Sequence, residues 1–179
     1  RVGQYLLEQQ LSAERPLVVL SGNDLEHALL ELGALYAGVP YTPVAPAYSL
    51  ASADFGKLRA IFALMTPGLV FASDRAAFRN AIDAVAPRDV EVIFEPKERP
   101  VTAALDAAHG MVGPDTIAKF LFTSGSTGAP KAVINTHGML TASQTARGQA
   151  WPFLDHTALV VLDWLPWSHT FGANHNFNM

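Results

Sequence analysis

The chain carries, at residues 121–138, the sequence LFTSGSTGAPKAVINTHG. A run of β-forming residues enters this segment and another leaves it, and four hydroxyl side chains and two glycines fall within residues 123–128. Glycines let backbone N–H groups turn toward a phosphate, hydroxyls supply further donors, and Lys131 adds a mobile positive charge. The segment therefore predicts an anion-binding loop between two strands, with an ordinary polar hairpin loop as the alternative.

The order of residues in this loop excludes three other functional loops. A Walker A loop ends in Gly-Lys followed by Ser or Thr, whereas here Pro130 precedes Lys131 and Ala132 follows it. The loop also lacks the GxGxxG pattern of dinucleotide-binding folds and the GxSxG pattern of α/β-hydrolases. The sequence therefore favours neither a P-loop NTPase, nor a Rossmann dehydrogenase, nor a serine hydrolase.

Apolar β-type runs alternate with helical patterns along the rest of the chain. The segments that we predict as strands are residues 17–20, 69–72, 90–94, 119–122, 131–135 and 159–165. The segments that we predict as helices are residues 25–37, 54–64, 75–85 and 136–148. The proline-rich residues 39–48 are predicted to be extended, and residues 97–115 to be an irregular surface excursion. This alternation predicts an α/β fold of layered, largely parallel sheets flanked by helices.

The helix predicted at residues 25–37 has recognisable boundaries. Asn23 and Asp24 carry side-chain oxygens of the kind that cap the first N–H groups of a helix. Gly38 follows the last apolar residue of the pattern, and glycine is the commonest residue just beyond a helix end.

Pro166 lies directly after the strand predicted at residues 159–165, and we expect it to end that strand and turn the chain. Parallel strands deliver their carboxyl ends to one edge of a sheet, where ligands bind. The segment after Pro166 is therefore expected beside the loop at residues 123–131. That segment contains His169, which we predict to lie within reach of the loop.

The composition narrows the class of protein. The 179 residues are 50% hydrophobic and 16% charged, which is typical of a packed domain or of part of a larger one. The net charge of −4 and the lack of a basic cluster argue against a nucleic-acid partner. The absence of cysteine excludes disulfides and thiol nucleophiles within these residues. No apolar run reaches transmembrane length, so we expect a cytoplasmic protein with no membrane partner.

Both ends of the sequence indicate a piece of a longer protein. Position 1 is not Met, and the last residues, FGANHNFNM, form an aromatic-rich stretch, whereas natural termini are usually more polar. We therefore expect the chain to be truncated at both ends.

The order TSGSTGAPK at residues 123–131 resembles the phosphate-loop signature of the acyl-adenylate-forming superfamily. This superfamily includes acyl- and aryl-CoA synthetases, peptide-synthetase adenylation domains and luciferases. Phe122 and Ala132 stand where many members carry Tyr and Gly, and neither change removes a phosphate-contacting group. Residues 21–48 and 162–172 also resemble family segments. The resemblance implies a partial N-terminal AMP-binding domain over residues 1–179, with the family's C-terminal domain absent.

By this resemblance, the loop binds the phosphates of ATP. The implied phosphate-binding residues are Thr123, Ser124, Gly125, Ser126, Thr127, Gly128 and Lys131. The resemblance puts Thr127 near Mg²⁺, and it implies catalytic roles for Lys131 at the outer phosphates and for His169 at the substrate carboxylate and α-phosphate. Taken singly, these residues have simpler interpretations as surface hydroxyls, a solvated lysine and a structural histidine.

Within the superfamily, the chain is similar to the feruloyl-CoA synthases, above all in KFLFTSGSTGAPKAVINTHGML and DWLPWSHTFGANHNF. This likeness implies that Trp167, Phe171, Asn174 and His175 line a pocket for an aromatic carboxylic acid, with core packing as the alternative for the aromatic residues. A zinc site at His169 and His175 is disfavoured, because no carboxylate or thiolate accompanies them.

The resemblance implies a two-step reaction. The acid first reacts with Mg-ATP to form an acyl-adenylate, and the thiol of coenzyme A then takes the acyl group. The expected partners are an aromatic carboxylic acid, ATP, Mg²⁺ and coenzyme A. Because the family carries further catalytic parts downstream, this chain alone is expected to be inactive. Another aryl- or acyl-CoA ligase, a non-catalytic nucleotide-binding module and a structural α/β domain stay open as alternatives.

Overall fold

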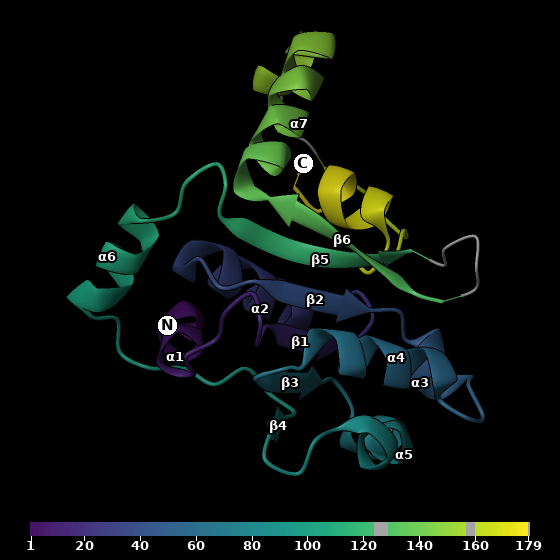
Figure 1. Cartoon of the computed structure of the whole chain (residues 1–179). Helices are drawn as coiled ribbons and strands as arrows, with labels where there is room; N and C mark the ends of the chain where they lie inside the picture. Colours follow the sequence, from purple (N-terminus) through teal and green to yellow (C-terminus); the bar gives the residue numbers. More distant parts are fainter. Residues whose placement is uncertain (124–128, 157–159, 179) are drawn as a thin grey trace.

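The computed structural model describes residues 1–123, 129–156 and 160–178, which form one six-stranded sheet between two layers of helices (Figure 1). Its strands are β1 (Leu17–Leu20), β2 (Tyr41–Val44), β3 (Leu69–Ala72), β4 (Glu91–Ile93), β5 (Ile117–Thr123) and β6 (Lys131–Thr136). Across the sheet they lie in the order β4-β3-β1-β2-β5-β6. Neighbouring strands are parallel except for β5 and β6, which are antiparallel. The predicted α/β fold with a largely parallel sheet is confirmed.

Helices cover both faces of the sheet. One face carries α1 (Val2–Glu8) and α2 (Leu25–Ala37), and the other carries α3 (Ala47–Leu50), α4 (Gly56–Met65) and α5 (Arg75–Val85). The other helical segments are α6 (Ala103–Gly110), α7 (His137–Ala150), the 3₁₀ turn η1 (Pro152–Asp155) and the π-helical turn η2 (Gly172–Asn176). Asp24 caps α2 and Gly38 ends it with a φ of 69°, as predicted. Across the described parts of the chain, no helix has the length and apolar character needed to cross a membrane.

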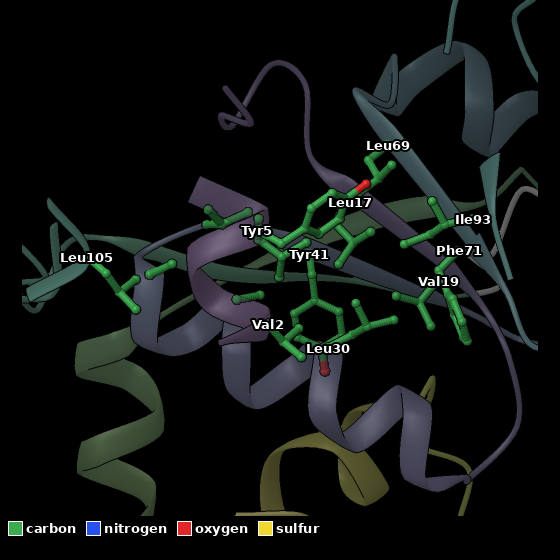
Figure 2. Close-up of a cluster of buried hydrophobic side chains, with 14 residues drawn as sticks. Val2, Tyr5, Leu17, Val19, Leu30, Tyr41, Leu69, Phe71, Ile93 and Leu105 are labelled. Carbon is green, nitrogen blue, oxygen red and sulfur yellow. The ribbon is translucent and has the colours of Figure 1, made fainter. Parts of the chain in front are cut away.

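The side chains of β1 alternate between two cores, one on each face of the sheet. Leu17 and Val19 join Leu30 of α2 in the core beneath α1 and α2 (Figure 2). Val18 and Leu20 join the core on the opposite face, beneath α4 and α5. Because successive residues of a strand point to opposite faces, a strand covered on both sides needs an unbroken apolar run.

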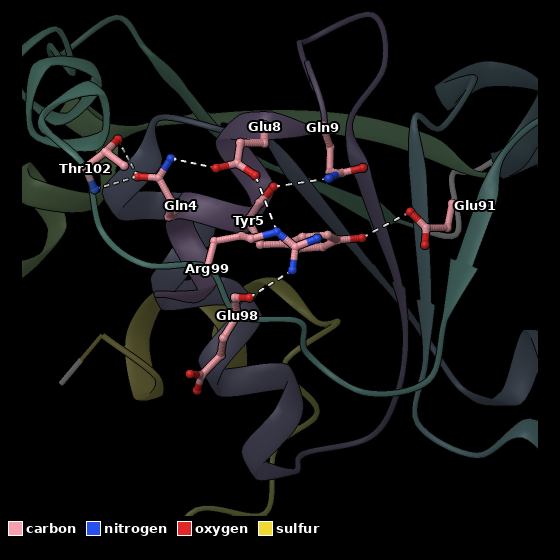
Figure 3. A network of polar contacts seen from close by, with 8 residues as sticks. All are labelled: Gln4, Tyr5, Glu8, Gln9, Glu91, Glu98, Arg99 and Thr102. Carbon is pink, nitrogen blue, oxygen red and sulfur yellow. Dashed lines mark hydrogen bonds and ion pairs between the residues drawn. The ribbon is translucent and has the colours of Figure 1, made fainter.

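A network of polar side chains ties α1 to the amino end of β4 (Figure 3). The Tyr5 hydroxyl donates to Glu91, the first residue of β4, at 3.1 Å. Gln4 accepts hydrogen bonds from the backbone N–H and the hydroxyl of Thr102, each at 3.1 Å, and so holds the start of α6. The network stabilises the sheet at the edge where the parallel strands begin, opposite the edge that carries the predicted phosphate loop.

Residues 160–165 do not form the predicted buried strand. Val160 and Leu162 are 100% and 96% exposed, and no strand of the described chain pairs with this segment. Asp163 instead accepts a hydrogen bond from the backbone N–H of Leu165 at 3.0 Å, and such local bonds compete with strand pairing. The prediction was wrong because β-forming residues make a strand only where tertiary context supplies a partner.

Other elements were not predicted from the sequence. Residues 97–115, expected to be irregular, contain α6, whose eight residues include four alanines that favour a helix. Residues 39–48, expected only to be extended, contribute β2 to the middle of the sheet despite Pro43. Proline cannot donate to a strand ladder, and the pairing of β2 with β5 is limited to Tyr41 with Lys119. Helices α1 and α3 were also not predicted.

Candidate functional site

The predicted phosphate loop connects two strands, as the sequence indicated. Thr123 ends β5, Lys131 begins β6, and the two residues are directly opposite each other in the ladder. Side chains of such a pair lie on the same face of a sheet, with Cβ atoms about 5 Å apart. Both residues are exposed, so a hydroxyl and an ammonium are open to an anion at the mouth of the loop. The other predicted loop ligands, Ser124, Gly125, Ser126, Thr127 and Gly128, lie outside the described residues.

The loop lies at the carboxyl edge of the parallel strands. β5 is parallel to β2 and β2 is parallel to β1, so Thr123, Val44 and Leu20 end their strands at the same edge. Thr123 also has the same parity along β5 as Lys119, whose side chain reaches α2. The side chains at the mouth of the loop therefore project from the face of the sheet that α2 covers.

The segment after Pro166 is fastened to this edge by Asn23, in the loop that follows β1. The Asn23 amide nitrogen donates to the carbonyl of Leu165 at 2.9 Å. Its amide oxygen accepts from the backbone N–H of Trp167, also at 2.9 Å. The segment therefore lies at the carboxyl edge, as expected, although the strand predicted before it is absent from the described residues.

Trp167 packs against buried side chains at this edge. Its ring meets His27 edge to face with centroids 5.4 Å apart, and it meets Phe177 at 4.8 Å. His27 is 1% exposed, and its Nδ1 contacts the carbonyl of Gly22 at 2.9 Å. Burial lowers the pKa of His27, against the opposing effect of the Gly22 bond. His27 is therefore a neutral packing neighbour of Trp167 near pH 7.

The turn η2 rests on the β5–β6 hairpin through two polar contacts. The Lys119 ammonium donates to the carbonyl of Ala173 at 3.0 Å, and the Asn174 amide donates to Asn135 Oδ1 at 2.7 Å. Lys119 and Asn135 are opposite each other in the ladder. By the two-residue period of a strand, η2 lies on the hairpin face from which the two side chains at the mouth of the loop project.

His169 lies in the turn immediately before η2, and it is exposed. Its backbone N–H donates to the carbonyl of Pro166 at 2.9 Å, and its carbonyl accepts from the N–H of Ala173 at 2.8 Å. Its Nδ1 accepts from the backbone N–H of Phe171 at 3.3 Å. A neutral imidazole that accepts at Nδ1 carries its proton on Nε2, so His169 presents a hydrogen-bond donor at the outer end of its ring.

The predicted pocket residues divide into two groups. Phe171 stacks on His175, with ring centroids 4.7 Å apart and planes at 13°, and Phe171 is 51% exposed. Asn174 uses its amide nitrogen to bond Asn135, whereas its Oδ1 is buried with no partner among the described atoms. Trp167 lies apart from this stack, against α2. The structure therefore brings these residues onto one segment but gives them different neighbours.

Sequence reasoning missed the charges that support this arrangement. Lys119 and Glu31 form an ion pair at 2.6 Å with both side chains 0% exposed. Burial lowers the pKa of Lys119, and the charge of Glu31 opposes that shift. One signal was present, because a lysine within the apolar run IAKFLF is rare in a buried strand unless it has a partner. Nothing in the sequence pointed to Glu31, which lies on a different element.

The profile of the AMP-binding enzyme family, described as "AMP-binding enzyme", matches residues 1–179. The chain belongs to this family. It is 28% identical over 150 residues to the probable non-canonical nonribosomal peptide synthetase CymA of Salinispora arenicola, covering 83% of this chain and 2% of that protein. It is 25% identical over 181 residues to a substituted indenylpropanoyl:CoA ligase of Rhodococcus jostii, covering 90% of this chain and 35% of the ligase.

Solved structures show the same fold. The crystal structure of ATP-bound MatB from Rhodopseudomonas palustris is 25% identical and superposes with a TM-score of 0.73, covering 99% of this chain and 35% of MatB. The six-stranded, mostly parallel sheet matches the N-terminal domain of acyl-adenylate-forming enzymes. The chain thus spans only part of the length of the relatives that it matches.

Proposed function

We propose that residues 1–179 are the N-terminal part of a longer acid–CoA ligase and supply the phosphate-binding part of its adenylation site. One observation carries the proposal: Thr123 and Lys131 flank the TSGSTGAPK loop on the sheet face where the segment bearing His169 docks. Exposed hydroxyls, a mobile ammonium and a glycine-rich backbone suit the triphosphate of ATP. Family membership and the likeness to ATP-bound MatB support the same assignment.

In the proposed reaction, a carboxylate oxygen of the acid attacks the α-phosphorus of ATP and pyrophosphate leaves. The product is a mixed anhydride, in which AMP is a far better leaving group than the original oxyanion. The thiol of coenzyme A then gives up its proton and attacks the acyl carbonyl, and AMP leaves. The protein holds two anionic reactants in line and offsets the charge that builds on the phosphate. Mg²⁺, held near Thr127, would supply further positive charge to the phosphates.

Three residues have separate roles in this proposal. Lys131 binds the outer phosphates as a mobile point charge, and Thr123 donates its hydroxyl to a phosphate oxygen. His169 donates from Nε2 to an oxygen at the α-phosphate as charge builds there. The hydrogen bond from the Phe171 N–H to Nδ1 selects the tautomer that this role requires.

We further propose that the acid is a hydroxycinnamate such as ferulate. Phe171 stacked on His175 offers a flat, partly exposed surface for an aryl ring, and Trp167 offers a second aromatic surface on the same segment. The unpartnered Oδ1 of Asn174 suits the hydroxyl or methoxy end of such a substrate only through its donors, so it favours a phenol. A second candidate is an adenylation domain that passes its acyl group to a carrier-protein thiol, and the likeness to the synthetase CymA favours it.

The test uses a full-length enzyme that contains this chain. Acid-dependent exchange of pyrophosphate into ATP should occur with ferulate, p-coumarate and caffeate, and much less with palmitate. Formation of the coenzyme A thioester, followed by chromatography, separates a CoA ligase from a carrier-dependent synthetase. Equal turnover of palmitate and ferulate would contradict the aromatic assignment, and exchange with no acid tested would contradict adenylation.

A further inference from the structure

A buried ion pair lies beneath η2, and the proposed chemistry does not use it. The Lys119 ammonium lies 2.6 Å from Glu31 Oε1 and 5.6 Å from the ring centroid of Tyr41, and both charged side chains are 0% exposed. An apolar pair of similar volume is often as stable as a buried ion pair or more stable. The stability of the core therefore does not by itself account for a lysine at this position of β5.

The ammonium has a further contact that gives it a role outside the core. It donates to the carbonyl of Ala173 in η2 at 3.0 Å, and Asn178 donates to the same oxygen at 3.2 Å. The backbone N–H of Ala173 in turn donates to the carbonyl of His169 at 2.8 Å. Lys119 therefore acts on the backbone that carries His169 through a single residue, Ala173.

Asn135 makes a matching contact from the neighbouring strand. It lies opposite Lys119 in the ladder, and its Oδ1 accepts from the amide of Asn174, the residue after Ala173. Two adjacent side chains of the hairpin thus hold two adjacent residues of η2. Two contacts of this kind restrain both the translation and the rotation of η2 on β5 and β6. The same two strands flank the phosphate loop, so the hairpin can set the separation between that loop and His169.

We propose that Lys119 and Asn135 are positioning residues that hold His169 in register with the phosphate loop, with Glu31 neutralising the buried lysine. The catalytic consequence rests on the function proposed above, whereas the docking of η2 does not. Lys119→Met alone would leave Glu31 as an unpaired buried charge and is expected to unfold the protein partly. The informative variant is Lys119→Met combined with Glu31→Leu, which removes both charges and retains similar volumes.

In the full-length enzyme, this double variant should keep an unfolding temperature close to that of the wild type. The backbone amides of Ala173 and Phe177 should nevertheless exchange with deuterium at least about tenfold faster, because η2 has lost its charged donor. Amides of β1 should be unaffected. The kcat of pyrophosphate exchange should fall about 10- to 100-fold while the KM for ATP changes by less than about threefold, because misplacement of a catalytic group affects the reaction more than binding.

Asn135→Leu provides a second test that leaves the ion pair intact, and it should shift amide exchange and kcat in the same directions. Lys97→Met is the matched control, because it removes a partly exposed ion pair with Glu91 far from η2, and all three measurements should stay unchanged. Wild-type amide exchange at Ala173 in a folded double variant would overturn the inference. If the wild-type enzyme adenylates no acid, the proposed function fails, and amide exchange alone then decides whether η2 is held by Lys119.

Discussion

His27 and Trp167 meet edge to face, with ring centroids 5.4 Å apart and planes at 81°. The contact joins α2, a helix of the first part of the fold, to the segment that carries the candidate catalytic histidine. His27 is buried, and its Nε2 has no partner among the described atoms. A proton added there would place an unpaired charge against the indole. The docking of Trp167 therefore depends on a neutral His27.

The free energy of unfolding is expected to fall as the pH drops below about 6.5. Burial holds the folded pKa of His27 below its ordinary value, and Lys119 lowers it too, while the Gly22 carbonyl, Glu31 and Asp24 act in the opposite direction. Between the folded and unfolded pKa values, the unfolded chain binds a proton that the folded chain does not. The stability is thus fully present above the unfolded pKa and is lost as the pH falls toward the folded pKa.

Urea titrations at several pH values between about 5 and 8 test this dependence. His27→Gln should flatten the slope of the unfolding free energy below about pH 6.5. Part of the slope should remain, because burial also lowers the pKa of His137. His156→Gln, at an exposed position, serves as the control and should preserve the slope. An identical slope in wild type and His27→Gln would rule out His27 as its source.

Gly172→Ala should destabilise the segment around η2. A Cβ at this position would lie 2.3 Å from the carbonyl oxygen of Pro166, and a backbone atom cannot move aside without shifting the segment. Overpacking of this kind costs about 1–3 kcal/mol. Gly148→Ala in α7 is the matched control, since a Cβ there meets nothing within 4 Å, and it should stabilise the protein by about 0.5–1 kcal/mol. Denaturant unfolding of both variants compares them, and equal stabilities would contradict the packing argument.

Thr127→Ala in the full-length enzyme should reduce adenylation strongly and leave folding nearly intact. Loss of one donor to a charged transition state costs about 2.7–4 kcal/mol, which corresponds to a rate loss of about 10²–10³-fold. Thr145→Ala, an exposed hydroxyl on α7, is the control and should retain wild-type exchange of pyrophosphate. Activity of Thr127→Ala within about threefold of the wild type would exclude a transition-state contact of this size.

His169→Ala should lower the adenylation rate more than it weakens the binding of ATP. Its proposed hydrogen bond forms fully only as charge builds in the transition state, so the loss appears mainly in kcat. Thr170→Ala changes the next exposed residue of the same turn and should have little effect. Single-turnover kinetics and equilibrium nucleotide binding separate the two quantities. Unchanged adenylation in His169→Ala would remove His169 from the mechanism.

The strands and helices that were predicted well are those with strong local signals. The strands at residues 17–20 and 69–72 are unbroken apolar runs, and the helix at residues 25–37 has both a cap and a glycine stop. The prediction failed for the run near residues 160–165, which has the composition of a strand but no partner in the described chain. Strand formation requires pairing between distant segments, and composition does not reveal the partner.

The order of residues in TSGSTGAPK determined the family by itself, because a loop that contacts phosphates must supply its donors in a particular order. The local periodicity likewise determined the α/β class. Only the tertiary structure decided how Asn23, Lys119 and Asn135 hold the segment around His169. Hydrogen bonds and ion pairs between distant residues depend on which strands and helices become neighbours. That outcome is set by packing of the whole sheet, and no local pattern in the chain records it.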